Sequence, residues 1–477
     1  MIDLSHSPLR QQFEFVAGKD ADPTIFVRQV SISFGEKVLP DVVRRAWDAV
    51  VAVTPALRGA ESSGVPSDGP ESGTVSSIWQ EIDWSGLSGD TVGESWAQLL
   101  NADATMPFVQ SPMQRVRLIL LPNDGLHLLW SSDARELDYS SLAGTLIRWF
   151  AACDLLESGR PVDWPQDSEP SDILARVADR PEDADKAFWK DHLSGFTAPL
   201  RPVLFPLASR DETPGGTRAS VSFTFERAER MELAKAADAM GVSLATVGRA
   251  AWTFLVAQVC DASELILTEP VEADSDSELS QTAGRFESWL PRRIAVSANQ
   301  SSADFCASLD AWFVDSARYL ATDTIAASAG VSLDDIFPSA AYLFRDGTLN
   351  DTLRRALPRW MAADVCVYEK ALHPLTLHWV DTDRPAIELG YDPAQISGAA
   401  ARDLLNRWVS LVRTLAEAPD AALGGISLLL PGEGTIVRGV EPATAARSLV
   451  PQCLHEVIND IAIERADHVA VECGGES

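Results

Sequence analysis

The sequence predicts a mixed α/β fold composed of two similar lobes. In both halves of the chain, strand-like alternation and helical apolar spacing follow each other in the order strand, helix, strands, helix. A break rich in proline and acidic residues, Trp164–Asp172, separates the two halves. The length of 477 residues is enough for about two to four structural units, each with its own hydrophobic core.

The first half contains a strand, a helix, a hairpin and a second helix. Residues Phe26–Phe34 alternate as a half-buried strand does, and Leu39–Val53 has the spacing of an amphipathic helix. Two apolar runs, Gln114–Leu121 and Gly125–Ser131, flank a Pro-Asn-Asp turn and predict a β-hairpin. Apolar residues at helical spacing over Tyr139–Cys153 complete this half.

The second half has the same types of element in a longer arrangement. Helical spacing predicts four helices, of which the third is strongly apolar: Pro181–Leu193, Arg227–Met240, Leu244–Val259 and Arg402–Ala416. Short apolar runs predict six strands: Arg218–Phe225, Leu265–Val271, Trp289–Val296, Ala340–Phe344, Leu375–Val380 and Ala386–Tyr391. Because the same types of element recur in both halves, the sequence predicts two similar α/β lobes.

Two polar stretches and the end of the chain lack the regular apolar spacing of the two halves. Two segments, Glu61–Val75 and Glu272–Gln281, are nearly devoid of apolar residues and predict exposed loops. The run Ile426–Val450 is loosely structured, and a helix over His455–Ala462 and a short strand over Val469–Cys473 follow it. This order indicates that a further domain begins where the sequence stops.

Charge and composition exclude several classes of protein. The 69 acidic and 39 basic side chains leave a net charge of −30, so nucleic acid is not an expected partner. No apolar run reaches the roughly 18 residues of a membrane span, and the first 15 residues lack a signal-peptide core. The six cysteines are far apart without a CxxC pair, which indicates a reducing, cytoplasmic location and no metal site.

Several segments in order resemble the condensation-domain superfamily of nonribosomal peptide synthetases. The similar segments are Ser5–Phe15 (SHSPLRQQFEF), Thr54–Arg58 (TPALR), Asp183–Gly195 (DADKAFWKDHLSG), Ala283–Val296 (AGRFESWLPRRIAV), His373–Trp379 (HPLTLHW) and Glu388–Ser397 (ELGYDPAQIS). Each motif is short, but their order and spacing match the family over about residues 1 to 435. The segment Leu454–Ser477 resembles the start of an adenylation domain.

The resemblance implies a fold, a domain plan and partners. It implies a chloramphenicol acetyltransferase-like pair of lobes in a V around a central tunnel. The lobes would span residues 1–175 and 176–430, followed by a linker (431–450) and the start of the adenylation domain (451–477). An upstream donor carrier protein and a downstream acceptor carrier protein would each insert a phosphopantetheine arm. These arms belong to the carriers, so the chain is expected to bind no cofactor of its own. The sequence has no cluster of metal ligands and no long apolar run, so neither a metal nor a membrane is expected as a partner.

One motif departs from the usual family pattern. Condensation domains carry HHxxxDG after the strand that ends here in WSS, but this chain reads Asp133-Ala-Arg-Glu-Leu-Asp138-Tyr-Ser-Ser141. The pattern DxxxxDxxS resembles that of heterocyclization domains, which form an amide to Ser, Thr or Cys and then cyclise its side chain to an oxazoline or thiazoline. Amide formation can depend largely on proximity. Cyclodehydration also needs proton transfer, which a carboxyl group with a raised pKa can supply.

The resemblance assigns roles within this motif. Asp138 aligns with a family carboxylate that pairs with an arginine across the lobes, here Arg293 or its neighbour Arg292. Asp133 would face the tunnel, as a catalytic or a structural group. We expect Ser141 to cap the following helix, because serine favours N-terminal helix positions.

Further site residues are expected at the tunnel. They are Glu136 and Arg135 in the motif loop, where Arg135 could pair internally, and Ser288 and Trp289 near the tunnel floor. The threonine and aspartate of heterocyclization domains are absent: Arg345 and Asp346 stand at the first place and Trp379 at the second. Asp346, Asp381 and His378 are the nearest substitutes, although each is also explained as a loop residue.

The interpretation is therefore a heterocyclization domain of a synthetase that makes an antibiotic or other secondary metabolite. Two alternatives stay open. The domain could form the linear amide and stop, or it could be a degenerate scaffold that recruits a carrier protein or a tailoring enzyme. The loss of the family Thr and Asp favours the scaffold, and the retained Asp133, Asp138 and Ser141 favour chemistry.

Overall fold

A computed structural model describes most of the chain. The described residues are 22–34, 38–58, 78–108, 113–170, 172–173, 182–196, 219–272, 282–316, 340–356, 364–370, 373, 375–393, 395–430 and 433. Contacts divide the chain into two units, Met1–Leu428 and Leu429–Ser477. The opening motif, the two predicted polar loops, nearly all of the expected linker and the expected adenylation start lie outside the described residues.

The first sheet has five strands in the order β2-β3-β4-β1-β9. Its strands are β1 (Val27–Ser33), β2 (Ile78–Asp83), β3 (Gln114–Leu120), β4 (Leu126–Asp133) and β9 (Asp364–Tyr368). β3 and β4 form the predicted antiparallel hairpin, and β1 pairs antiparallel with both β4 and β9. β2 runs parallel to β3.

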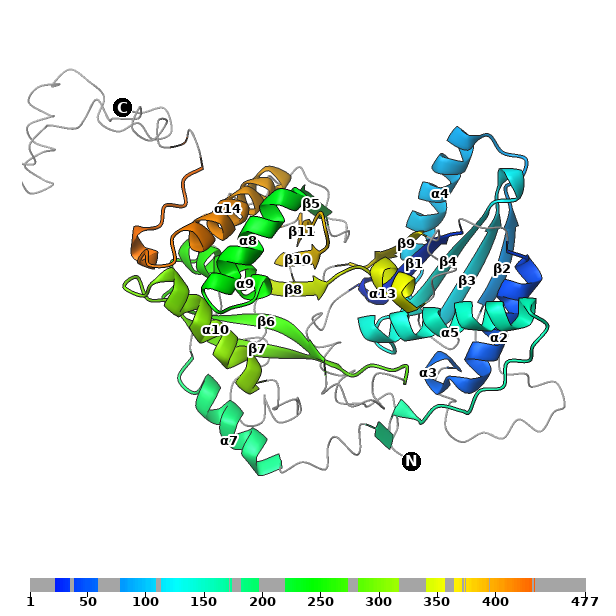
Figure 1. Cartoon of the computed structure of the whole chain (residues 1–477), viewed down its shortest axis with the longest axis horizontal. Helices are drawn as coiled ribbons and strands as arrows, with labels where there is room; N and C mark the ends of the chain where they lie inside the picture. The colour runs from blue at the N-terminus through cyan, green and yellow to red at the C-terminus, as the bar shows by residue number, and fades with distance from the viewer. Residues whose placement is uncertain are drawn as a thin grey trace, which may run out of the picture. The chain divides into compact units, whose positions relative to one another are not determined.

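Two helices build the main core of this sheet. The helices α2 (Pro40–Val53) and α5 (Tyr139–Glu157) pack together, and their apolar faces join Val30, Ile32 and Trp130 in one buried cluster. Trp47 and Trp149 are fully buried at its centre, with ring centroids 4.4 Å apart. The helix α4 (Gly89–Ala104) contacts β1. The short helix α3 (Pro55–Arg58) follows α2 (Figure 1).

The second sheet has six strands in the order β5-β11-β10-β8-β6-β7. They are β5 (Ala219–Thr224), β6 (Glu264–Glu272), β7 (Glu287–Ala295), β8 (Ala340–Asp346), β10 (Leu375–Asp381) and β11 (Ala386–Tyr391). β8 runs parallel to β6 and β10, and the other pairs are antiparallel. The mixed pairing means that β8 and β10 end at the same edge.

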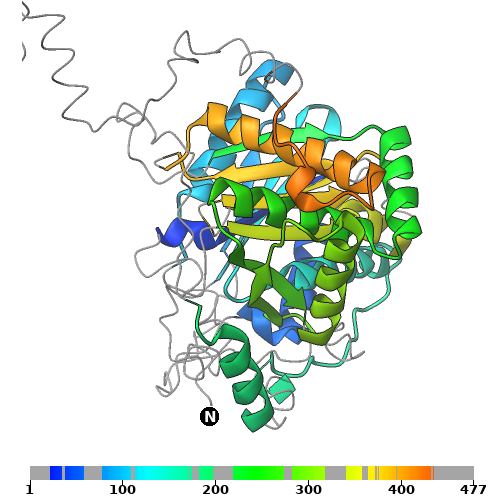
Figure 2. The same cartoon turned by 90° about the vertical axis from the view of Figure 1, so that its left-hand side faces the viewer.

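Helices cover this second sheet and complete its core (Figure 2). They are α8 (Arg227–Ala239), α9 (Leu244–Val259), α10 (Ser302–Ser316) and α14 (Gly398–Glu417), with α7 (Glu182–Leu193) earlier in the chain. α9 is buried along nearly its whole length, as its continuous apolar sequence predicts. Gly248 allows this close packing, because a Cβ there would lie 2.6 Å from Trp379 and from the Tyr342 hydroxyl.

The chain crosses from the second sheet to the first and back. After β8, the helix α13 (Leu349–Ala356) packs on α5, and β9 then adds to the edge of the first sheet beside β1. The next strand, β10, is again in the second sheet. The two sheets therefore share one continuous segment, and the residues directly after β9 lie between them.

The predicted elements and the observed ones agree in type wherever the structure describes them. The bounds differ mainly at the ends: α5 continues to Glu157, and β8 includes Arg345 and Asp346, which the sequence analysis placed beyond the strand. Six elements were not predicted from the sequence: β2, β9, α3, α4, α10 and α13. Within the described residues, no single helix could span a membrane; α8 and α9, bent by 90°, pass the length and composition test only as a pair.

Candidate functional site

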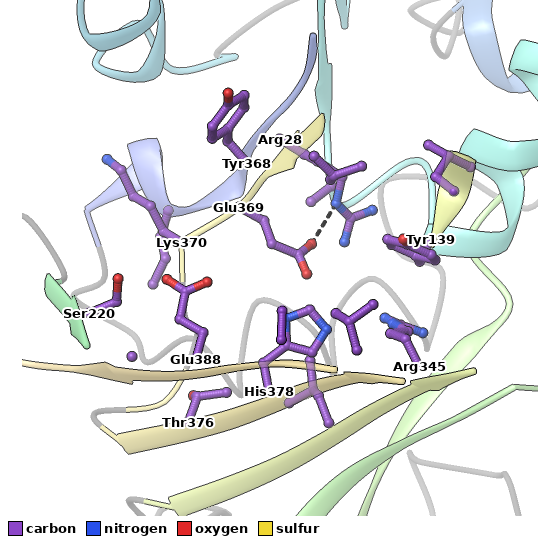
Figure 3. A pocket seen from close by; sticks show the side chains of 18 of the residues that line it. Arg28, Tyr139, Ser220, Arg345, Tyr368, Glu369, Lys370, Thr376, His378 and Glu388 are labelled. Atoms are coloured by element: carbon purple, nitrogen blue, oxygen red, sulfur yellow. Dashed lines mark hydrogen bonds and ion pairs between the residues drawn. The ribbon is translucent and has the colours of Figure 1, made fainter. Parts of the chain in front are cut away.

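A cavity of about 380 Å³ lies between the two sheets. Residues of β1 and β9 line it from the first sheet, and residues of β5, β7, β8, β10 and β11 line it from the second. Figure 3 shows its charged and polar side chains: Arg28, Tyr139, Ser220, Arg345, Tyr368, Glu369, Lys370, Thr376, His378 and Glu388. Both lobes therefore contribute functional groups to one shared space.

An ion pair from the first sheet reaches into this cavity. The Arg28 guanidinium, buried on β1, donates to the Glu369 carboxylate at 2.8 Å (Figure 3). Burial alone would raise the pKa of Glu369, but the positive charges of Arg28 and Arg345 outweigh it and lower that pKa to about 2. Glu369 is therefore ionised at every physiological pH.

Charged residues of the second sheet also form ion pairs at the cavity wall. The Arg345 guanidinium donates to Glu287 at 3.4 Å and lies over the Tyr139 ring, 4.3 Å from its centroid. Arg285 is 3.8 Å from the other oxygen of Glu287. Positive and negative groups thus alternate along the cavity wall, which limits the cost of keeping them out of water.

His378 stands between these charges on β10. Burial lowers the pKa of its imidazole below the usual 6.5, and the nearby Glu369 carboxylate only partly opposes that effect. The ring is therefore neutral near pH 7. Its Nε2 atom is shielded from solvent and has no hydrogen-bond partner in the described part of the chain. The imidazole can therefore accept a proton at Nε2, because no described residue is hydrogen-bonded to that atom.

The Asp133–Ser141 loop lies where β4 meets α5, and Asp138 joins it to the second sheet. One carboxylate oxygen accepts from the Ser141 amide at 2.9 Å, so Asp138 is the N-cap of α5. The other oxygen accepts from the backbone amides of Phe286 and Glu287, at 2.8 and 3.2 Å. Asp138 is 2% exposed, and both of its carboxylate oxygens have partners: one caps α5 and the other joins the loop to the second sheet.

Other hydrogen bonds hold the same loop from both sides. The Ser141 hydroxyl exchanges hydrogen bonds with the backbone of Gly284, and the Arg285 guanidinium donates to the Ala134 carbonyl at 2.7 Å. From the first sheet, Arg28 donates to the Leu137 carbonyl at 2.9 Å. The loop is therefore held between the sheets by charge-assisted bonds to its backbone.

Asp133 is held within the loop. It is buried, and it accepts from the Arg135 amide at 2.8 Å and from the Arg135 guanidinium at 2.6 Å. The predicted internal pairing of Arg135 is confirmed. Neither Asp133 nor Asp138 lines the cavity, and Glu136, partly buried, does not line it either.

Two pairings expected in this motif are wrong. Arg293 binds Glu264 at 2.7 Å rather than Asp138, and Arg292 is buried with Glu269 as its nearest recorded carboxylate, at 3.9 Å. The partners of Asp138 are the Ser141 hydroxyl, at 2.8 Å, and three backbone amides, and the amides carry no sequence signal. Ser141 is also not the cap: it lies inside α5, and Asp138 caps the helix.

Of the remaining residues predicted for the site, some line the cavity and others lie outside its lining. Arg345, His378 and Trp289 line the cavity, and Trp289 is buried beside the His373 ring. Asp346 and Asp381 are opposite each other at the ends of β8 and β10, outside the cavity lining. Asp381 is buried and binds Arg230 at 2.6 Å, whereas Asp346 is exposed. The structure does not describe the Ser288 side chain.

Most of the charged lining was not predicted as part of a site. Arg28, Glu369 and Lys370 lie outside every motif found in the sequence, whereas Glu287 and Glu388 lie inside two of them, Ala283–Val296 and Glu388–Ser397, but were not expected at the site. A charged residue within a buried strand, such as Arg28 in β1, is the one signal that could have indicated a buried ion pair.

In the described part of the chain, no cluster of three or more potential metal ligands occurs.

The comparison with known families agrees with this architecture. The condensation-domain profile matches residues 6–323, and the chain belongs to the condensation-domain family. It is similar to one of the proteins that make up the linear gramicidin synthase of Brevibacillus parabrevis, with 21% identity over 406 residues. That match covers 82% of this chain and 5% of the relative, so the chain spans a small part of its length.

Solved structures show the same fold. The X-domain from teicoplanin biosynthesis is 16% identical with a TM-score of 0.72, and the match covers 90% of this chain and 98% of that one. The first condensation domain of the calcium-dependent antibiotic synthetase, in complex with a substrate analogue, is 16% identical with a TM-score of 0.69 over 89% of this chain and 98% of that one. The expected chloramphenicol acetyltransferase-like fold with two sheets is confirmed.

Proposed function

We propose that this chain forms an amide bond between two carrier-tethered substrates in the cavity between its sheets. The observation that carries the proposal is His378, a neutral imidazole that lines the cavity and has an unoccupied Nε2 atom in the described structure. The family membership of the chain supports the same activity. The donor and acceptor would be thioesters on the phosphopantetheine arms of two carrier proteins.

The proposed reaction is aminolysis of the donor thioester. The acceptor nitrogen attacks the donor carbonyl carbon, the C–N bond forms, and the C–S bond breaks to release the donor arm as a thiol. His378 accepts the proton that the nitrogen loses and returns it to the leaving sulfur. Glu369 stabilises the imidazolium in between, since its pKa of about 2 keeps it ionised. Alignment of the two arms supplies most of the acceleration.

We further propose that a cyclodehydration of an acceptor Ser, Thr or Cys side chain follows. The DxxxxDxxS pattern of Asp133, Asp138 and Ser141 supports this heterocyclization step. In this proposal Asp133 and Asp138 hold the loop, because each carboxylate already accepts several hydrogen bonds. The proton transfers would fall to His378 and Glu388, which line the cavity on neighbouring strands.

The chain would work within a larger synthetase. The relative named above and bacitracin synthase 1 of Bacillus licheniformis (21% identical over 301 residues) are synthases far longer than this chain. We propose an upstream carrier as donor, a downstream carrier as acceptor, and an adenylation domain that begins in residues 451–477. The resemblance of Leu454–Ser477 to the start of such a domain supports this arrangement.

Intact-mass spectrometry of the downstream carrier tests the function. The upstream carrier is loaded with an acyl group, the downstream carrier with seryl, threonyl or cysteinyl, and the full chain is added or omitted. A carrier heavier by the acyl group supports condensation, and a further loss of one water supports heterocyclization. No transfer to any acceptor, with loading confirmed, would instead support the recruiting scaffold.

Variants then test the site. We expect His378→Gln to lower the rate of amide formation by about 10²- to 10⁴-fold, the usual value of a general base. The control is Glu232→Gln, which removes a charge from an exposed ion pair on α8 and leaves the cavity intact. A His378→Gln variant that keeps the wild-type rate would exclude His378 as the base.

A further inference from the structure

Two of the three carboxylates that line the cavity have a cationic partner. Glu369 accepts from Arg28 at 2.8 Å, and Glu287 accepts from Arg345 at 3.4 Å with Arg285 nearby. Each of these carboxylates therefore faces at least one guanidinium, and Glu287 faces two. The third carboxylate, Glu388, differs from them.

Glu388 has no ion pair or hydrogen bond to any residue in the part of the chain that the structure describes. It lies on β11 and faces the cavity together with His378, and the two residues are direct neighbours in the β10–β11 register (Figure 3). Residues opposite each other in an antiparallel pair have Cβ atoms about 4.5–5.5 Å apart. The Glu388 charge accordingly acts on the His378 imidazole and opposes, in small part, the lowering of its pKa by burial.

Two further cations of the cavity wall, Lys370 and Arg345, are bound to other groups. Lys370 donates through Nζ to the Thr24 hydroxyl at 2.6 Å, and Arg345 is bound to Glu287. The cavity therefore contains one negative charge next to the proposed base without a recorded counter-charge. A cationic group of a substrate is the chemical complement of that arrangement.

We propose that Glu388 binds the α-ammonium group of the acceptor substrate and positions that nitrogen beside His378. The proposal rests on the amide-forming function proposed above and names the residue that would recognise its acceptor. A carboxylate holds the amine while it is protonated, and the neighbouring imidazole is placed to remove its proton before attack. An acceptor without an amine would gain nothing from Glu388.

Binding of two stable probes to the full chain tests the proposal. The first is alanyl-pantetheine amide, in which an amide replaces the thioester so that no reaction occurs. The second is propionyl-pantetheine amide, which lacks only the amine. A charge-assisted hydrogen bond of the usual strength predicts about tenfold tighter binding of the alanyl probe at pH 7 by calorimetry. In Glu388→Gln, the two probes should bind equally.

Control variants show whether the preference depends on the Glu388 carboxylate. Glu232→Gln should retain the tenfold preference, and Glu388→Asp should retain part of it, since the shorter side chain keeps the charge. A preference that survives in Glu388→Gln would overturn the proposal, as would equal or undetectable binding of both probes by the wild-type chain. Tighter binding of an Nα-acetyl-lysyl probe through Glu388 would also overturn it, by assigning the carboxylate to a side chain.

The binding experiment is independent of turnover. If the chain makes no amide but the preference depends on Glu388, the proposed function fails and the amine site stands. If the chain makes the amide and Glu388→Gln keeps the preference, the function stands and the amine site fails. The two proposals can therefore fail separately.

Discussion

Substitution of Asp138 by serine separates the two tasks of this side chain. The carboxylate caps α5 through one oxygen and accepts the Phe286 and Glu287 amides through the other. Serine is as good an N-cap as aspartate, but its single short hydroxyl cannot also reach β7. Asp138→Ser therefore keeps the cap and removes the two hydrogen bonds from Phe286 and Glu287.

The expected cost follows from the groups left behind. Two buried amides would lose their acceptor, at about 1–3 kcal/mol each when nothing replaces it. Water that enters the vacated space would recover part of this, so we expect a loss of about 2–4 kcal/mol in the free energy of unfolding. That loss is a large share of the roughly 5–15 kcal/mol by which domains are stable.

The assay is urea unfolding followed by tryptophan fluorescence, with hydrogen exchange at the two amides as a local measure. The control is Ser397→Ala, which removes the N-cap of α14 without any bond to the other sheet and should cost about 1 kcal/mol. Asp138→Ser should therefore be the more damaging change. If it costs less than Ser397→Ala and the Phe286 and Glu287 amides stay protected, the reasoning is refuted.

Three further predictions concern packing and pH. Gly248→Ala should lower the free energy of unfolding by about 1–3 kcal/mol because its Cβ would meet ring atoms at 2.6 Å, whereas Gly144→Ala, in open space on α5, should raise the thermal midpoint slightly. Burial and two nearby arginines lower the pKa of His192 to about 4, below the unfolded value near 6.5. Its contribution to stability is thus present above pH 6.5 and lost as pH falls toward 4, and acid unfolding of His192→Gln should lack this slope. Glu369→Gln strands the buried Arg28 and should cost about 2–3 kcal/mol at pH 7, less than a fully buried pair because Glu369 partly reaches solvent. The Glu369 contribution is present above pH 4.5 and lost toward pH 2, so equal acid titrations of the variant and the wild type would contradict the pairing.

The local elements could be predicted because their signals are local. The apolar run of α9, the hairpin of β3 and β4, and the strand β11 each depend on residues within about ten positions, and hydrophobic periodicity encodes them. Short motifs in a set order likewise indicated the family, which the comparison then confirmed. The place of the Asp133–Ser141 loop between a strand and a helix was predictable for the same reason.

The pairings across the molecule could not be predicted in this way. β9 belongs to the first sheet because it pairs with β1, more than 330 positions earlier, and no periodicity reports on such a partner. The Arg28–Glu369 ion pair depends on that crossover. Asp138 was expected to pair with Arg293, yet it accepts hydrogen bonds from the Ser141 hydroxyl and from backbone amides, which every residue except proline offers.

The sequence by itself therefore determined most of the elements, the mixed α/β class with two sheets and the family. Only the tertiary structure decided which charges meet in the cavity, where His378 and Glu388 are neighbours on adjacent strands. Asp133 instead pairs within its own loop, and Asp138 links that loop to the second sheet. The physical reason is the distance along the chain over which each effect acts. Backbone propensity and amphipathic spacing depend on residues within one or two turns. Buried ion pairs form between groups that are far apart in sequence and meet only in the folded chain.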